Sequence, residues 1–91
     1  MDAGDRVAEI ERRLTEAFSP ESLVVEDEGH LHVGHEGAKD GRGHFRVSIV
    51  SSAFNGMNAI AKHRAIYQVM GALMQTDIHA LAIEATASDE F

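Results

Sequence analysis

The order of its hydrophobic repeats limits the fold of this chain more than any other feature of the sequence. A helical repeat comes first, two strand-like segments follow, and a long second helical repeat precedes a third strand-like segment. The chain has only 91 residues, so one modest core must bury the apolar face of every element. We therefore expect a single domain over residues 1–91, with its core at about 5–87 and a tail at 88–91.

The first helix is expected over residues 5–18. One apolar stripe, at spacings of three and four residues, is formed by Val7, Ile10, Leu14 and Ala17. Asp5 is the expected N-cap, because its carboxylate can accept a hydrogen bond from the free N–H groups of the first turn. Pro20 should stop the helix, since it lacks an N–H and restricts Ser19 before it.

Three segments are expected to be strands: residues 23–26, 44–50 and 78–87. The middle segment gives the clearest signal, because its apolar residues alternate with polar ones. A long connection over residues 27–43, rich in glycine and histidine, separates it from the first strand. Loops of this length are uncommon in compact domains, so we expect this one to carry functional residues.

The second helix is expected over residues 57–74, as the main cover of the sheet. Its expected buried stripe consists of Ile60, His63, Tyr67, Met70 and Met74, widened by Ala59, Ile66 and Leu73. On this stripe His63 is expected to be a packed, hydrogen-bonded core residue. Gly71 should weaken the last turn, because glycine costs about 1 kcal/mol relative to alanine inside a helix.

These elements predict an α+β fold with two layers. The first two strands can pair antiparallel through the long loop, and the third can lie parallel to the second after a right-handed helical crossover. A three-stranded mixed sheet offers core for only one layer, so both helices should cover the same face. The order α-β-β-α-β is that of a KH-like domain.

Composition excludes several classes of function. The chain has no cysteine, so it can form no disulfide, no thiolate nucleophile and no cysteine-ligated metal site of its own. Its net charge of −7 counts against strong unaided binding of nucleic acid. No segment approaches the roughly 18 apolar residues of a membrane span, and no targeting signal is evident. We expect a cytoplasmic protein that is not an enzyme.

Histidine is the unusual residue, with six in the chain. His30, His32 and His35 lie close together in the long loop, and imidazole suits zinc, copper, nickel or iron. An independent metal site in this loop is one reading, and a solvated loop that happens to be rich in histidine is the other. His44 and His79 each open a strand, so either could face the loop. Together with a loop ligand they would form an incomplete site, without a thiolate, that a partner could complete.

A second candidate site is a small basic patch of Arg46, Lys62 and Arg64. Such a patch could contact nucleic acid, although solvated surface charges explain the same residues more simply.

Four motifs, in order and at matching spacing, resemble the BolA family over about residues 6–87. They are His44-Phe45-Arg46-Val47, Val50-Ser51-x-x-Phe54-x-Gly56, Lys62-His63-Arg64-x-Ile66-Tyr67 and Ile78-His79-Ala80-Leu81. Val25-Glu26-Asp27-Glu28 and the loop residue His32 fit the same pattern. The resemblance implies the KH-like fold reached above.

The resemblance also implies a function. Proteins of this family pair with monothiol glutaredoxins, and the pair can hold a bridging 2Fe–2S cluster in cluster trafficking, assembly or iron regulation. The glutaredoxin side supplies a cysteine and a glutathione thiolate. The BolA-like side supplies a histidine that matches His79 here and a loop ligand that matches His32, with His35 as the alternative. The isolated chain would then hold no cofactor and be a monomer or a weak homodimer.

Other family members are described as transcription regulators that bind DNA, which is the alternative implied function. This chain departs from the family pattern at Gly29, where serine is common, and at Gln75, where an acidic residue is usual. Lys62 stands where arginine is common, and an ammonium group lacks the planar fork of donors that a guanidinium offers.

Overall fold

The computed structural model describes residues 2–29 and 41–90. Its elements follow the order α1 (Ala3–Phe18), β1 (Ser22–Asp27), β2 (Gly43–Ser51), η3 (Ser52–Phe54), α2 (Ala59–Met70), α3 (Leu73–Thr76), β3 (Ile78–Ala87) and η4 (Ser88–Glu90). The three strands form one mixed sheet in the order β1-β2-β3, with β1 antiparallel and β3 parallel to β2. The predicted α+β fold is confirmed.

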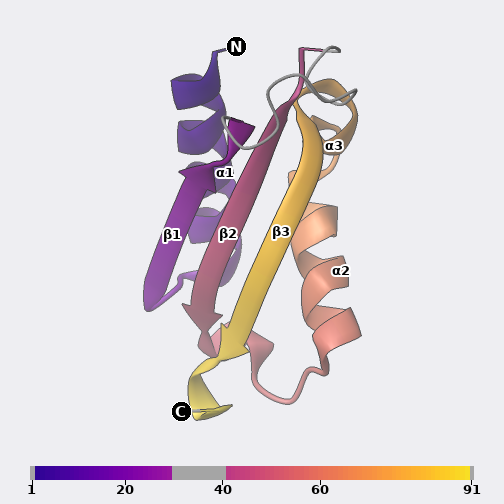
Figure 1. Cartoon of the computed structure of the whole chain (residues 1–91). Coiled ribbons are helices and arrows are strands. Elements are labelled where there is room, and N and C mark those ends of the chain that lie inside the picture. The colour runs from indigo at the N-terminus through magenta and orange to yellow at the C-terminus, as the bar shows by residue number, and fades with distance from the viewer. Residues whose placement is uncertain (1, 30–40, 91) are drawn as a thin grey trace.

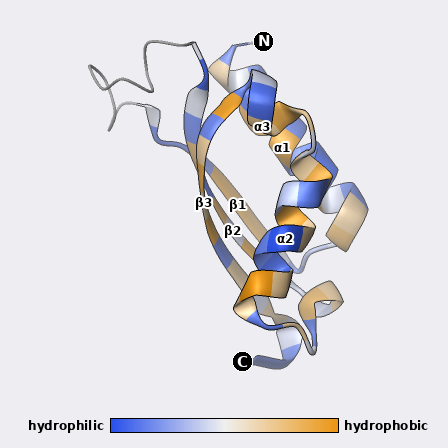
Figure 2. Ribbon diagram, turned by 90° about the vertical axis from the view of Figure 1, so that its right-hand side faces the viewer, coloured by the Kyte–Doolittle hydropathy of each residue, from blue (hydrophilic) through white to orange (hydrophobic). Residues whose placement is uncertain are grey.

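The helices form one layer and the sheet forms the other. Figure 2 shows α1 and α2 on the same side of the sheet. The alternation predicted for β2 is also confirmed, because Phe45, Val47 and Ile49 are buried against the helices. Ile10 and Leu14 of α1 complete the core from the helical layer. None of the helices in the described part of the chain is long and apolar enough to cross a membrane.

Helix α1 begins two residues earlier than predicted. Asp2, and not Asp5, is the N-cap: its carboxylate accepts a hydrogen bond from the backbone N–H of Asp5 at 2.8 Å. Asp5 therefore lies within the first turn. The apolar stripe could not reveal this extra half turn, because Ala3 and Gly4 are exposed. Ala17 is exposed as well, and Phe18 packs against the core in its place.

The long second helix predicted over residues 57–74 is two helices. Asn58 caps α2 by accepting from the N–H of Ala61 at 2.8 Å. Gly71 ends α2 with a φ of +54° and a ψ of −128°, a conformation open to glycine. Residues Leu73–Thr76 then form the short α3. Gly71 is thus a break between helices and not merely a weak point.

The buried stripe of α2 also differs from the prediction. Lys62, Ile66 and Met70 face the sheet, whereas Ile60 and Tyr67 are 63% and 41% exposed. His63 is exposed too, so its predicted core role is wrong. Apolar residues occur on most sides of this helix, so periodicity alone could not choose the buried side. Lys62 lies outside the predicted stripe and is nevertheless buried, because its aliphatic stem can pack against apolar surface.

The last described residues, predicted as a tail, fold against the domain. Residues Ser88–Glu90 form the 3₁₀ turn η4, and the Glu90 carboxylate pairs with the ammonium of Lys62, which is only 8% exposed. The carboxylate is what allows this buried cation to be accommodated at the edge of the core.

Candidate functional site

One end of the sheet gathers the starts of two strands and the end of a third. Because β1 runs antiparallel and β3 parallel to β2, the residues Asp27, Gly43 and Ile78 lie at the same end (Figure 1). Two backbone hydrogen bonds tie this end together: Glu28 N–H donates to the His44 carbonyl at 2.8 Å, and Gly43 N–H donates to the Asp77 carbonyl at 2.9 Å.

A register irregularity places His79 at this end. Gly43 is paired with Ile78 and His44 with Ala80, so His79 is an extra residue on β3. Ile78 and Leu81 both remain in the core, at 1% and 9% exposure, while His79 is exposed. Such a bulge redirects a side chain and is common beside functional sites.

The two strand-opening histidines meet as a result. The ring centroids of His44 and His79 lie 5.0 Å apart at an interplanar angle of 46°. His44 is buried at 8% exposure, and the His79 ring lies next to it on the surface. The two strand openings therefore lie side by side at this end of the sheet.

Arg42 is the third polar side chain of this end. Its Nη2 lies 3.1 Å from Nδ1 of His79. A guanidinium can only donate, so Nδ1 of His79 accepts this hydrogen bond. The contact between Arg42 and His79 was not predicted from the sequence, because the parallel pairing of β2 with β3 is what brings residues 42 and 79 together.

Gly43 leaves room for the Phe45 ring in the same corner. A Cβ atom at position 43 would lie 2.6 Å from Cε2 of Phe45, which real contacts do not allow. The small residue is therefore required by close packing of the strand start against the first core side chain.

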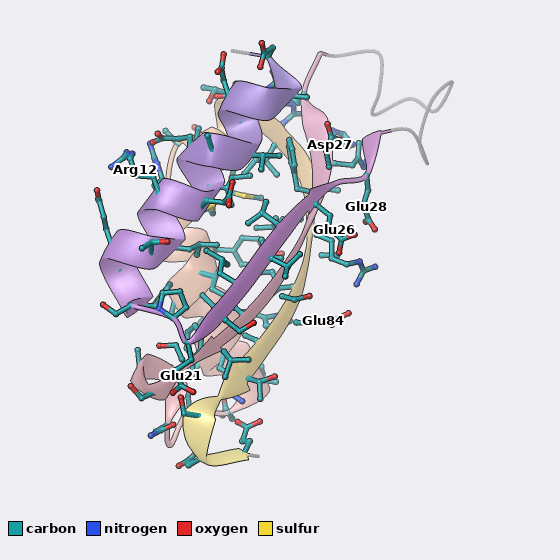
Figure 3. The ribbon with its side chains drawn as sticks, turned by 90° about the vertical axis from the view of Figure 1, so that its left-hand side faces the viewer. Arg12, Glu21, Glu26, Asp27, Glu28 and Glu84 are labelled. Atoms are coloured by element: carbon teal, nitrogen blue, oxygen red, sulfur yellow. The ribbon has the colours of Figure 1, made fainter. Side chains whose placement is uncertain are left out.

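The open face of the sheet, opposite the helices, carries a compact ionic cluster. Arg46 Nε pairs with Glu28 at 3.1 Å, and its Nη1 pairs with Glu84 at 2.9 Å. Figure 3 shows Glu28 and Glu84 on the side of the sheet away from α1. The Glu28 carboxylate, followed by Glu84, raises the pKa of the Arg46 guanidinium above its ordinary value. The cation of Arg46 is thus held between two carboxylates.

The predicted basic patch is dispersed in the structure. Arg46 belongs to the ionic cluster on the open face, while Lys62 and Arg64 belong to α2 behind the sheet. Lys62 is buried against Glu90, and Arg64 is exposed. The structure does not bring these three cations onto one surface.

A shallow groove between α1 and α2 is a separate feature. It is lined by Arg12, Arg13, Glu16, Ala17 and Val69. Arg12 pairs with Glu9 and Glu16, and Arg13 donates to the carbonyl of Met70 at 2.8 Å. These arginines serve intrachain contacts and are not arranged around an anion.

The remaining predicted ligands, His32 and its alternative His35, lie outside the described residues, as does His30. Within residues 2–29 and 41–90, no group of three or more histidine, aspartate or glutamate side chains is placed to hold a metal ion. His79 and His44 therefore fit a metal group only as a part of a donor set. Neutral imidazoles suit iron and zinc, and the missing donors would have to come from elsewhere.

Comparisons with known proteins agree on one family. The sequence model of BolA-like proteins matches residues 14–90. A Sinorhizobium sp protein, named an uncharacterized protein in the cobS 5′ region, is 49% identical over 89% of each chain. The DNA-binding transcriptional regulator BolA of Haemophilus influenzae is 33% identical over 90% of this chain and 77% of its own length.

Solved structures and longer relatives extend this result. The BolA domain of SufE1 from Arabidopsis thaliana superimposes with a TM-score of 0.87 at 34% identity, covering 99% of this chain and all of that domain. Protein BOLA1, chloroplastic, of the same plant is 36% identical over 94% of this chain, which spans 56% of its length. Additional segments are thus present in some relatives.

Proposed function

This chain belongs to the BolA family, and from that premise we propose that it is a non-enzymatic partner of monothiol glutaredoxins. In the proposal the two proteins share a bridging 2Fe–2S cluster, in cluster trafficking, assembly or iron regulation. The proposed compartment is the cytoplasm, where thiols stay reduced.

One observation carries the proposal. The bulge in β3 places His79 on the surface beside His44, at a strand end whose described residues lack a complete donor set. An exposed imidazole in an incomplete set suits a cluster that lies between two proteins. A buried, complete set would suit a resident metal instead.

The proposed ligands divide between the partners. This chain supplies His79 and one loop histidine, His32 or alternatively His35. The glutaredoxin supplies its cysteine, and glutathione supplies a second thiolate. Replacing thiolates by imidazoles raises the reduction potential of a 2Fe–2S cluster, as in Rieske centres. His44 supports the His79 ring from its buried side.

The test is anaerobic cluster reconstitution of this chain with a monothiol glutaredoxin and glutathione. Visible circular dichroism and size exclusion follow the product, with the glutaredoxin alone as reference. The expected result is a one-to-one complex whose spectrum differs from that of the glutaredoxin homodimer. An unchanged spectrum with no complex would refute the proposed partnership.

Matched histidine variants identify the ligands. We expect His79→Ala to lose or change the mixed spectrum while the domain stays folded, because the side chain is exposed. His63→Ala, an exposed histidine on α2, should leave the spectrum unchanged. Comparing His32→Ala with His35→Ala then shows which loop residue binds. A normal mixed spectrum in His79→Ala would count directly against the assignment.

A DNA-binding regulator is the second candidate, favoured by the name of the Haemophilus influenzae relative. The net charge of −7 and the pairing of Lys62 and Arg46 with carboxylates leave Arg64 as the accessible member of the predicted patch. If duplex DNA binds at low salt, Arg64→Ala should reduce the salt slope by about 1. No retention of duplex at low salt would eliminate this candidate.

A further inference from the structure

We propose that Arg42 is a positioning residue that competes with metal for His79. In this proposal its guanidinium holds the His79 ring in one tautomer and must withdraw before the ring can bind a metal ion or cluster. The inference rests on the proposed function for its biological meaning, but its chemistry concerns only residues 42 and 79.

The hydrogen bond fixes where the ring proton lies. Arg42 Nη2 is 3.1 Å from His79 Nδ1, and a guanidinium has N–H groups but no acceptor. Nδ1 must therefore present its lone pair. A neutral imidazole has one protonated nitrogen and one nitrogen with a free lone pair, so the proton lies on Nε2.

Metal binding conflicts with this arrangement at either nitrogen. A metal at Nδ1 would need the lone pair that Arg42 now uses. A metal at Nε2 would need the ring proton to move to Nδ1, where it would face the N–H of Arg42, donor against donor. Either route requires the guanidinium to leave.

The backbone keeps residues 42 and 79 close to each other. Gly43 N–H donates to the Asp77 carbonyl at 2.9 Å, and Gly43 is paired with Ile78 at the start of β3. Arg6 fixes Asp77 in turn, through an ion pair of 3.1 Å. Strand pairing thus keeps the backbone of Arg42 within side-chain reach of His79, while the guanidinium itself can move on its long stem.

The first test reads the tautomer directly in the isolated chain. Long-range ¹H–¹⁵N NMR at about pH 8, where an ordinary histidine is neutral, reports which ring nitrogen carries the proton. We expect His79 to be protonated at Nε2 in the native chain and in Arg42→Lys, which keeps a donor. Arg42→Ala should shift the ring toward a mixture. An unchanged tautomer in Arg42→Ala would overturn the proposal.

The second test measures competition with Zn²⁺ alone, followed at the His79 ring signals. Loss of this exposed hydrogen bond, at the net strength of an ordinary hydrogen bond, should lower the half-saturating Zn²⁺ concentration roughly twofold to tenfold in Arg42→Ala. The half-saturating Zn²⁺ concentration of Arg42→Lys should lie closer to that of the native chain. Arg64→Ala removes the same charge from α2 and should leave the value unchanged. Equal half-saturation in the native chain and Arg42→Ala would contradict the proposal.

A third arm separates this inference from the proposed function. Reconstitution with glutaredoxin and glutathione should give a mixed cluster that Arg42→Ala forms more readily than the native chain. If the tautomer and Zn²⁺ results hold but no mixed cluster forms, the proposed function fails and the role of Arg42 stands. If the cluster forms while Arg42→Ala changes neither tautomer nor Zn²⁺ binding, the role of Arg42 fails and the function stands.

Discussion

At the scale of single residues, the candidate site depends on one extra position in β3. The alternation of apolar residues around Leu81 predicts a strand, and the sequence shows that His79 lies at its start. The bulge that turns His79 to the surface could not be predicted, because it exists only relative to Gly43 and His44 on β2. The contact between Arg42 and His79 escaped prediction for the same reason.

Gly43 gives a residue-scale prediction. A Cβ there would lie 2.6 Å and 2.7 Å from two atoms of the Phe45 ring, so Gly43→Ala must displace the ring or the strand start. Overpacking of this kind costs typically about 1–3 kcal/mol. We expect urea unfolding to show a loss in that range.

The control for Gly43→Ala is a double variant. Phe45→Leu removes the ring that the new Cβ would meet, so the two substitutions should interact. The combined loss in the free energy of unfolding should be smaller than the sum of the single losses. Strict additivity would mean that the close contact with Phe45 is not what requires glycine.

At the scale of elements, local sequence patterns predicted the order and type of the helices and strands. They did not predict which side of α2 faces the core. The alternation of β2 and the stripe of Ile10 and Leu14 reported real buried faces. In α2, however, apolar residues such as Ile60 and Tyr67 point outward while Lys62 is buried. Its partner Glu90 comes from the chain end, so no local pattern could indicate that Lys62 turns inward.

The break between α2 and α3 gives an element-scale prediction. Gly71 has a φ of +54° and a ψ of −128°, a region that L side chains rarely adopt. Gly71→Ala should therefore destabilise the domain by about 1–3 kcal/mol, measured by urea unfolding.

Gly4→Ala is the matched control, because it also adds one methyl group to a glycine. Gly4 lies inside α1, and a Cβ there meets only ordinary contact at 3.5 Å. Alanine should stabilise this helix by about 0.5–1 kcal/mol. If both variants changed the free energy of unfolding in the same direction, the backbone conformation of Gly71 would not be what requires glycine there.

At the scale of the whole molecule, ion pairs join segments that are far apart in the chain. Arg6 reaches Asp77, Lys62 reaches Glu90, and Arg46 joins Glu28 to Glu84 across the sheet. Sequence composition showed an excess of acid but could not show which carboxylates are paired, because pairing depends on the assembled layers.

These pairs predict loss of stability in acid. Hydrogen bonds from Arg12 and Arg13 lower the pKa of Glu9 to about 2, and those from Thr76 and Arg6 lower the pKa of Asp77. The Lys62 ammonium lowers the pKa of Glu90. Below its ordinary pKa each group binds more protons in the unfolded chain, so stability is full at neutral pH and falls through the acid range.

Thermal unfolding between about pH 7 and pH 2 measures this effect. We expect the native chain to lose stability mainly below pH 4.5, the ordinary pKa of a glutamate carboxyl. Glutamine has no titratable carboxyl group, so the Glu9→Gln variant should lose less stability over the same pH range. Parallel curves for the native chain and Glu9→Gln would show that the pairs of Glu9 do not contribute.

The proposed function requires that this chain donate histidine nitrogen to a shared cluster. Its most direct test is pulsed electron paramagnetic resonance on the reduced mixed cluster, with ¹⁵N-histidine in this chain and natural-abundance glutaredoxin. We expect nitrogen couplings that change with the label and that diminish in His79→Ala. Couplings insensitive to the label, in a cluster that still forms with this chain, would contradict it.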